Sequence, residues 1–160
     1  MATGQSGGYA SYGDKLNATL SSMGLWHRFI EFDESVKTVE QAAKKVQAEK
    51  IAKTIVMVDA NGEPLVAIVQ ALSKISYRKL KGLLSVRDVR LANAQEVLEY
   101  SGYPVGGVPP FNKIKRILLD QQVLQKETAI VGGGDVNKLV EIRTKDIVTI
   151  LEPIVADISK

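Results

Sequence analysis

Two apolar segments joined by a tight turn lie in the middle of the sequence and limit the folds open to it. Residues 53–58 (KTIVMV) form a β-branched run typical of a buried strand, and residues 65–69 (LVAIV) form a second one. Asn61-Gly62 lies between them, and this dipeptide favours the turn of a β-hairpin. The sequence therefore predicts an antiparallel strand pair here.

Segments with helical signals surround this hairpin. Asn93 and Glu96 have the spacing of a capping box, as do Thr38 and Gln41. Because helices and strands do not alternate regularly, their order favours an α+β domain with a mixed sheet over a doubly wound parallel one. Helices are predicted from Asp14 to Gly24, from Asn93 to Gly102 and from Thr144 to before Pro153, and two more are predicted to begin at Thr38 and Ser76. Further strands are predicted at 28–32, 114–119, 127–131 and 138–142. Residues 86–91 alternate between charged and apolar side chains.

The length of 160 residues fits one domain. We expect residues 1–13, which are small and polar with four glycines, to form a flexible N-terminal tail, and residues 14–160 to form the domain. No run of 18 apolar residues and no secretory signal is present, so we expect a cytoplasmic protein without a membrane partner.

The inventory of reactive side chains excludes several kinds of chemistry. The chain has no cysteine and a single histidine, His27. Disulfides, thiolate zinc sites, a cysteine nucleophile and a multi-histidine metal centre are therefore excluded, and no metal or cofactor is expected. His27 precedes a predicted strand with no partner in view, so we interpret it as an ordinary surface or packing residue.

Two glycine-rich segments are candidate ligand sites. Residues 102–113 (GYPVGGVPPFNK) combine three glycines with three prolines, which suits a stiff loop that holds backbone N–H groups toward a developing oxyanion. The alternative is a rigid surface connection. Residues 132–135 (GGGD) follow a predicted strand but lack the lysine and hydroxyl of a P-loop, so a tight turn is favoured over a phosphate cradle.

Several cations are candidate contacts for phosphate. Lys53 opens an apolar strand, either as a solvated strand end or as a cation at the mouth of a cleft. Lys113, Lys115 and Arg116 follow the glycine-proline segment, and Lys79 lies on the short basic helix after Ser76. The net charge of +3 permits contact with nucleic acid without requiring it.

Several segments, taken in order, resemble one family. The matching segments are, in chain order, Ala42-Ala43, Ala52-Lys53-Thr54, the loop 101–110 (SGYPVGGVPP), Glu127-Thr128 to Gly133-Gly134, and Glu141-Ile142 with Asp146-Ile147. They are similar to segments of the YbaK/prolyl-tRNA synthetase-associated editing domains. The resemblance covers roughly residues 25–155 and implies a single α+β domain with a mixed, curved β-sheet and flanking helices. It also implies an aminoacyl-tRNA deacylase, free-standing in this case.

The resemblance assigns expected roles to individual residues. Lys53 corresponds to the functional lysine, and Gly106 and Pro110 match the family's glycine-x-x-x-proline motif at the aminoacyl end. Water or a ribose hydroxyl of the substrate then makes the attack, since members lack a side-chain nucleophile. Residues expected to bind substrate are Phe32, Thr54, Gly107, Val108, Pro109, Gly132, Gly133 and Leu139; those expected to contact tRNA are Lys79, Lys113, Lys115 and Arg116.

The chain departs from the family pattern near the expected pocket. Phe32 replaces a frequent tyrosine, Gly132 replaces a serine, Leu139 replaces a polar residue found in some members, and Asn112 follows Phe111 where relatives often have glycine. These changes put in doubt which amino acid is removed.

Three functions are compared. The first is a trans-editing hydrolase that removes a small amino acid from a mischarged tRNA, with tRNA-Pro as the expected tRNA and prolyl-tRNA synthetase as a candidate partner. The second is a non-catalytic module of the same fold that binds an aminoacyl or nucleotide end. The third, a DNA-binding protein that uses the basic helix after Ser76, lacks a helix-turn-helix partner. The sequence leaves the oligomeric state open.

Overall fold

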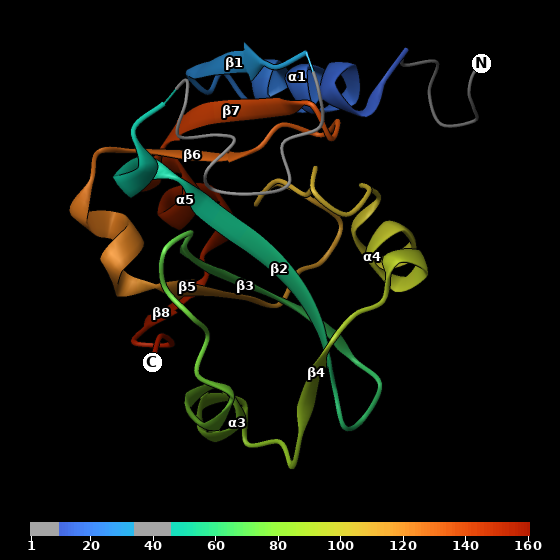
Figure 1. Cartoon of the computed structure of the whole chain (residues 1–160), viewed down its shortest axis with the longest axis vertical. Helices are drawn as coiled ribbons and strands as arrows, with labels where there is room; N and C mark the ends of the chain where they lie inside the picture. The colour runs from blue at the N-terminus through green and yellow to red at the C-terminus, as the bar shows by residue number, and fades with distance from the viewer. Residues whose placement is uncertain (1–9, 34–45) are drawn as a thin grey trace.

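Eight β-strands form two sheets in the computed structural model, which describes residues 10–33 and 46–160. Four α-helices are found in the same residues (Figure 1). In chain order the elements are α1 (Tyr12–Ser22), β1 (His27–Glu31), η1 (Ala48–Lys50), β2 (Ala52–Asp59), β3 (Pro64–Gln70), α3 (Tyr77–Leu84), β4 (Val89–Leu91), α4 (Ala94–Ser101), β5 (Ile117–Asp120), η2 (Gln121–Gln125), β6 (Thr128–Gly132), β7 (Lys138–Arg143), α5 (Thr144–Leu151) and β8 (Ile154–Ala156), where η marks a 3-10 helix.

The larger sheet is mixed and has the strand order β4-β2-β3-β5-β8. Strands β2 and β3 form the predicted antiparallel hairpin, and Gly62 in its turn has a φ of +81°. Strand β5 pairs in parallel with β3 and with β8. The α+β class is confirmed, but the strands divide between two sheets instead of one. The second sheet is antiparallel, with the order β1-β7-β6.

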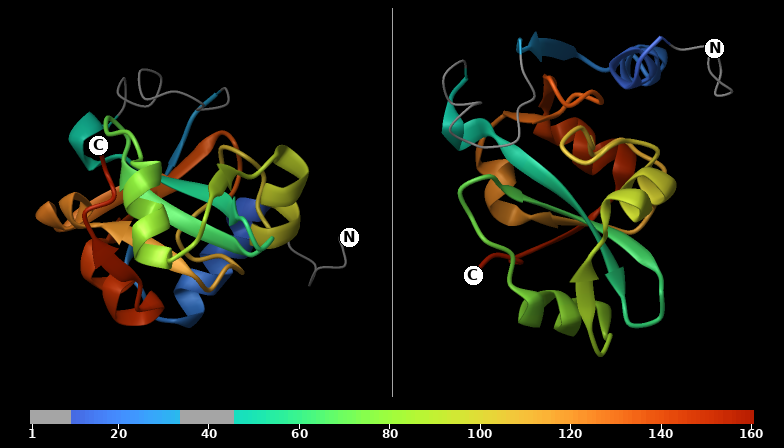
Figure 2. Two further views of the ribbon diagram at one scale, coloured as in Figure 1. Left: turned by 90° about the horizontal axis from the view of Figure 1, so that it is seen from below. Right: turned by 45° about the vertical axis from the view of Figure 1, so that its right-hand side comes forward.

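The two sheets share one core and meet at an isolated bridge between Ile51 and Ile130. Figure 2 shows the three-stranded sheet at one end of the molecule and α3 at the other. The shared core receives Leu16 and Leu20 of α1, and α4 and α5 also contribute to it. Helix α3 instead buries Leu80 on the opposite face of the larger sheet. Side chains alternate between the two faces of β2, β3 and β5, so these strands contribute residues to two separate hydrophobic clusters, one on each face of the sheet.

Helix α1 begins two residues earlier than predicted. Ser11 caps it by accepting a hydrogen bond from the Asp14 N–H, and Gly13 is buried in its first turn. Tyr12 and Gly13 therefore belong to the helix and not to the predicted tail. Residues 1–9 lie outside the described residues, as does most of the helix predicted from Thr38.

Further differences from the prediction concern β5, α5 and β8. Strand β5 begins at Ile117, not at Ile114. Thr144 is the first residue of α5, not its cap, because its hydroxyl donates to the carbonyls of Lys126 and Glu127. Strand β8 was not predicted, since two of its three residues are exposed and it forms only by parallel pairing with β5.

Candidate functional site

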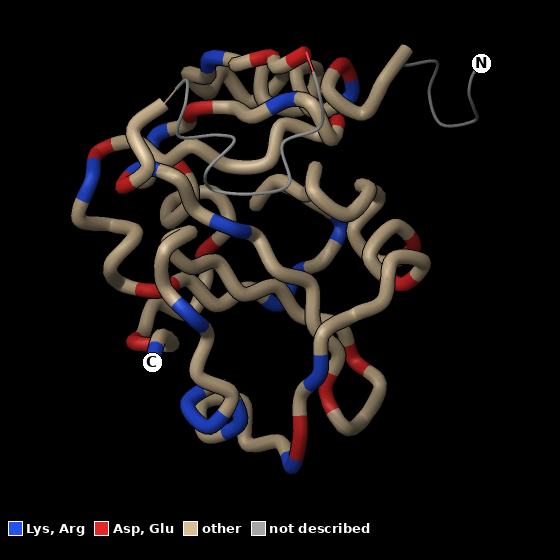
Figure 3. The backbone as a smooth tube through the Cα atoms, in the orientation of Figure 1, with Lys and Arg blue, Asp and Glu red and all other residues tan. Residues whose placement is uncertain are grey.

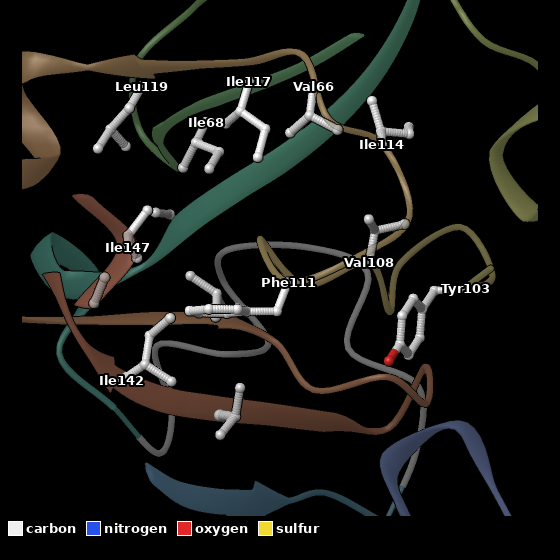
Figure 4. Close-up of a cluster of buried hydrophobic side chains, with 14 of the residues drawn as sticks. Val66, Ile68, Tyr103, Val108, Phe111, Ile114, Ile117, Leu119, Ile142 and Ile147 are labelled. Atoms are coloured by element: carbon white, nitrogen blue, oxygen red, sulfur yellow. The ribbon is translucent and has the colours of Figure 1, made fainter. Parts of the chain in front are cut away.

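The glycine-proline loop is anchored in the core rather than lying loosely on the surface. It leaves α4 at Gly102 and turns at Gly106, where φ is +88°, a conformation that favours glycine. The side chains of Val108 and Phe111 point into the shared core, Phe111 near Ile142 and Val108 between Ile114 and Tyr103 (Figure 4). Burial of each side chain contributes about 2 kcal/mol. The reading of this segment as a stiff loop is therefore consistent with its packing.

Asn112 fixes the end of this loop, and sequence reasoning missed it. Its side-chain amide donates to the carbonyls of Pro109 at 2.8 Å and Pro110 at 3.3 Å, while its oxygen accepts from the Ile114 N–H at 2.8 Å. Two prolines leave carbonyls without neighbouring N–H donors, and a following asparagine can satisfy them. The departure from the glycine of relatives is thus a structural brace.

The second glycine segment is a tight turn, as favoured from the sequence. It connects β6 to β7, and the Gly133 N–H donates to the Lys138 carbonyl at 3.0 Å. Its Gly134 N–H donates to the Gly107 carbonyl at 2.8 Å, which joins this turn to the glycine-proline loop. A Cβ atom on Gly107 or on Gly132 would overlap backbone atoms of the other segment. Contact between the two segments therefore requires glycine on both sides.

Helix α1 closes this arrangement from a third side. The Asp135 carboxylate accepts hydrogen bonds from the N–H groups of Tyr12 at 3.2 Å and Gly13 at 3.1 Å. An anion is favourable at a helix N-terminus because the first N–H groups have no partner within the helix. Gly134, with a φ of +97°, lies against the Tyr12 backbone. The loop, the glycine turn and α1 therefore form one braced unit.

Only some of the backbone N–H groups of the glycine-proline loop are free to donate a hydrogen bond to an oxyanion. The Gly107 N–H donates to the Pro104 carbonyl at 3.0 Å, so it closes a turn of the loop and does not point to a ligand. Within the described residues, the N–H groups of Gly106 and Val108 have no backbone partner. Of the N–H groups from Gly106 to Val108, these two are therefore the candidate donors to an oxyanion.

Lys53 and Thr54 lie on opposite faces of β2. Ala52 and Val56 belong to the shared core, so the pleat places Thr54 on that face, and its Oγ1 is buried without a hydrogen-bond partner among residues 10–33 and 46–160. Lys53 is exposed and lies on the other face of the strand. Because side chains alternate, this is the face of Ile51, two residues earlier, and not the face of Thr54. In the part of the chain that the structure describes, no carboxylate pairs with the Lys53 ammonium.

Three of the four residues at which the chain departs from the family pattern lie on one face of the sheets. Phe32 packs partly buried against a cluster that contains Leu139 and Ile51. Gly132 is the register partner of Leu139 across β6 and β7. These residues share the face of the sheets on which Lys53 lies, by the alternation of side chains along the strands. The structure thus groups Lys53 with Phe32, Leu139 and Gly132, and separates it from Thr54.

The four predicted tRNA contacts divide into two paired and two unpaired cations. Lys79 donates to Asp157 at 2.7 Å and to the Ser159 carbonyl, which ties α3 to the C-terminal segment. Arg116 donates to the buried carboxylate of Asp59 at 2.8 Å. Lys113 and Lys115 are exposed and form no ion pair within the described residues. Helix α3, on which Lys79 lies, carries a group of basic residues at the lower end of the molecule (Figure 3).

Glu141 is a buried carboxylate that sequence reasoning did not single out as a site residue. It accepts from Thr128 Oγ1 at 2.6 Å and from Arg28 at 2.7 Å, and Lys50 lies 3.6 Å away. Burial raises its pKa, but the hydrogen bonds from Thr128 and Arg28 and the charges of Lys50 and Arg28 outweigh burial and leave the pKa below its usual value. The group is therefore an ionised structural anchor at neutral pH.

His27 behaves as a structural residue. Its Nδ1 lies 2.8 Å from the Leu25 carbonyl and its Nε2 lies 2.7 Å from Asn17 Oδ1. Both nitrogens are thus engaged within the protein. Among residues 10–33 and 46–160, no group of three or more His, Asp or Glu side chains has the geometry of a metal site, and no helix is long and apolar enough to cross a membrane.

Comparison with known proteins identifies the family. Residues 33–150 match the family model of the aminoacyl-tRNA editing domain. The proline–tRNA ligase of Maridesulfovibrio salexigens is 32% identical over 100 residues, which are 61% of this chain and 17% of the ligase. The chain therefore spans only a small part of the ligases that it matches.

Two solved structures share the fold over nearly their whole length. One, of a hypothetical protein, has a TM-score of 0.82 and 31% identity and covers 91% of this chain and 99% of its own. The other, described as a candidate trans-editing enzyme for prolyl-tRNA synthetase, has a TM-score of 0.81 and 24% identity over 93% of this chain and 97% of its own; at this identity the likeness concerns the fold alone. With its family match over residues 33–150, the chain belongs to the aminoacyl-tRNA editing domain family.

Proposed function

We propose that this protein is a trans-editing hydrolase that removes a small amino acid from mischarged tRNA, with tRNA-Pro as the substrate tRNA. One observation carries the proposal beyond family membership: the glycine-proline loop is held backbone to backbone against the β6–β7 turn. A site that accelerates hydrolysis by orientation needs such a fixed frame, because small displacements of the reacting groups are costly.

The proposed chemistry uses positioning in place of a protein nucleophile. An aminoacyl ester is already activated, so an oriented water and stabilisation of the developing oxyanion suffice. The N–H groups of Gly106 and Val108 supply that stabilisation, with Pro110 stiffening the end of the loop. Lys53 holds the phosphate or ribose end of the terminal nucleotide, and a ribose hydroxyl orients the water.

The amino acid is selected by a small pocket on the Lys53 face. We assign its walls to Phe32, Leu139 and Gly132, with Gly133, Pro109 and the backbone of Val108 at the loop side. A synthetase gains only about 1–3 kcal/mol of discrimination from one methylene, so a second, size-limited site raises the accuracy of aminoacylation. The apolar character of Phe32 and Leu139 favours a small amino acid with an apolar side chain. Prolyl-tRNA synthetase is the proposed source of the mischarged tRNA.

Deacylation of a panel of charged tRNAs tests this proposal. Transfer RNAs charged with alanine, cysteine, serine or threonine are incubated with the protein, alongside correctly charged prolyl-tRNA. We expect catalytic loss of one or two of the mischarged amino acids and survival of the prolyl ester. Binding of charged tRNA without hydrolysis of any ester would instead establish the alternative, a non-catalytic module of the same fold.

A further inference from the structure

A hollow of about 310 Å³ opens beside the segment that follows the glycine-proline loop. Three parts of the chain line it: the end of the β2–β3 turn, the last turn of α4, and the residues that lead into β5. The lining residues are Glu63, Pro64, Tyr100, Lys113, Ile114, Lys115 and Arg116. Its volume is that of a small-ligand site, and none of the residues with proposed roles in hydrolysis or amino acid selection lines it.

The hollow carries an excess of positive charge. Arg116 is neutralised by the buried Asp59 carboxylate at 2.8 Å, which also fixes its guanidinium in the wall. Lys113 and Lys115 have no carboxylate partner among the described residues, and Glu63 is the one acidic residue in the lining. Two cations in a concave site therefore remain available to an anionic ligand.

A further lysine, Lys15 of α1, lies near Lys113 at Gly102, outside the lining of the hollow, with its ammonium 4.9 Å from the centre of the Tyr103 ring. Lys15 Nζ and Lys113 Cε lie 3.2 Å and 3.5 Å from the position that a Cβ of Gly102 would occupy. Burial lowers the pKa of Lys15, and the neighbouring charge of Lys113 lowers it further. Lys15 therefore adds positive charge beside Lys113, which lines the hollow, and this charge favours an anionic ligand there.

Tyr100 adds an aromatic surface to these charges. It is half-buried and packs against the shared core, so its ring is held in place at the wall of the hollow. Cations that track a phosphate backbone, combined with a fixed aromatic ring for base stacking, are the features of sites for single-stranded nucleic acid. Membrane surfaces and duplexes do not require the ring.

We propose that this hollow binds the single-stranded 3′ end of tRNA, with backbone phosphates on Lys113 and Lys115 and one base against Tyr100. The inference rests on the proposed function for the identity of the RNA. The covalent path supports it, because the loop proposed to hold the terminal aminoacyl nucleotide continues within three residues, from Pro110, into Lys113. Nucleotides that precede the terminal one would then lie along the same segment.

Binding of a short, uncharged, single-stranded RNA with the 3′ sequence of a tRNA tests this inference, measured at several salt concentrations. Lys113→Gln combined with Lys115→Gln should lower the slope of log affinity against log salt by about 1.4, the loss of two phosphate contacts on a single strand. Lys126→Gln with Lys145→Gln, which removes two exposed cations elsewhere, should leave the slope unchanged. Tyr100→Leu should weaken binding roughly tenfold, whereas Tyr100→Phe should not.

An unchanged slope in the Lys113/Lys115 variant, or no binding by the unmodified protein, would overturn the inference. Equal binding of a duplex RNA, insensitive to Tyr100, would overturn the role of the base. Hydrolysis of an aminoacyl-adenosine ester, which lacks the preceding phosphates, separates this inference from the proposed function. If the wild type and the Lys113/Lys115 variant hydrolyse this small ester at equal rates, and the variant has a raised KM for aminoacyl-tRNA, the result supports both the inference and the proposed function. Lys113/Lys115-dependent RNA binding without any hydrolysis would refute the proposed function and keep the inference.

Discussion

At the scale of single residues, Lys53 is the side chain on which the proposed chemistry most depends. It is exposed at the start of β2, and its ammonium has no ion-pair partner within the described residues. Lys53→Ala should therefore change the stability by less than about 0.5 kcal/mol. Loss of a charge that contacts the reacting end should lower the deacylation rate about 100-fold. Single-turnover rates and thermal unfolding together check this, and full activity in the variant would end the proposed role.

His27 provides the opposite expectation. Both of its ring nitrogens are engaged by Leu25 and Asn17, so it has no free nitrogen to act as a base. His27→Ala should keep a near-normal rate, whereas tRNA without the terminal 2′-hydroxyl, charged at the 3′ position, should react slowly. Quenched time courses of both reactions, analysed by mass spectrometry, test the scheme. A trapped acyl-protein, or a folded but inactive His27 variant, would contradict it.

Asp59 makes stability depend on pH. Burial raises the pKa of its carboxyl, but hydrogen bonds from Arg116, Glu63 and Asn61 and the charge of Arg116 outweigh burial, so the pKa in the folded state is lowered. A lowered pKa adds stability that is fully present above the unfolded value, about 3.9, and is lost as pH falls through the folded value. The free energy of unfolding should thus decline below about pH 4.

Urea unfolding between pH 2 and pH 7 measures this contribution. Asp59→Asn should be less stable at pH 7 by about 2 kcal/mol and should show a shallower decline in acid. Glu127→Gln, which removes an exposed carboxylate, should keep the wild-type decline. A decline in Asp59→Asn as steep as that of the wild type would show that other carboxyl groups account for it.

At the scale of elements, the contact between the two glycine segments depends on the absence of side chains. Gly107→Ala should displace the loop from the β6–β7 turn, because its methyl would overlap the Gly134 backbone. We expect a loss of about 2 kcal/mol of stability and a strongly reduced kcat. Gly82→Ala, in α3 and with nothing nearby, should instead stabilise the protein by up to about 1 kcal/mol. Chemical denaturation and deacylation rates of both variants decide this, and an active, stable Gly107→Ala protein would contradict the contact.

Elements specified by local signals were predictable, and elements that depend on distant partners were not. The hairpin at Gly62, the Ser76 cap and the capping box of Asn93 with Glu96 are all present, because each depends on a few neighbouring residues. Strand β8 and the division into two sheets depend on pairing across the fold, which short-range patterns do not encode.

The candidate site shows the same division. The sequence indicated both glycine segments, but their contact through Gly107 and Gly134 is tertiary. It also indicated Arg116 and Lys79 as free cations, whereas each pairs with an aspartate at least 57 residues away in sequence. Such partners are invisible from spacing alone. The brace by Asn112 had a local signal, since asparagine after consecutive prolines can satisfy their carbonyls.

At the scale of the whole molecule, two sheets and three helices pack around one core and leave two faces for the proposed substrate. One face carries Lys53 with Phe32 and Leu139, and the hollow with Lys113 and Lys115 lies further along the segment that follows the loop. A modest net charge of +3 suits weak binding and rapid release of tRNA. The protein would then depend on its fixed site more than on affinity to select mischarged tRNA.

Single-turnover hydrolysis, with the protein in excess over alanyl-tRNA-Pro and with bound tRNA measured in the same samples, tests the central claim most directly. The account predicts release of alanine well above the spontaneous rate, no acceleration for prolyl-tRNA-Pro, and loss of the acceleration in Lys53→Ala. The same series with cysteine, serine and threonine esters allows for a different small amino acid. Saturated binding without acceleration for any of these esters would contradict the account.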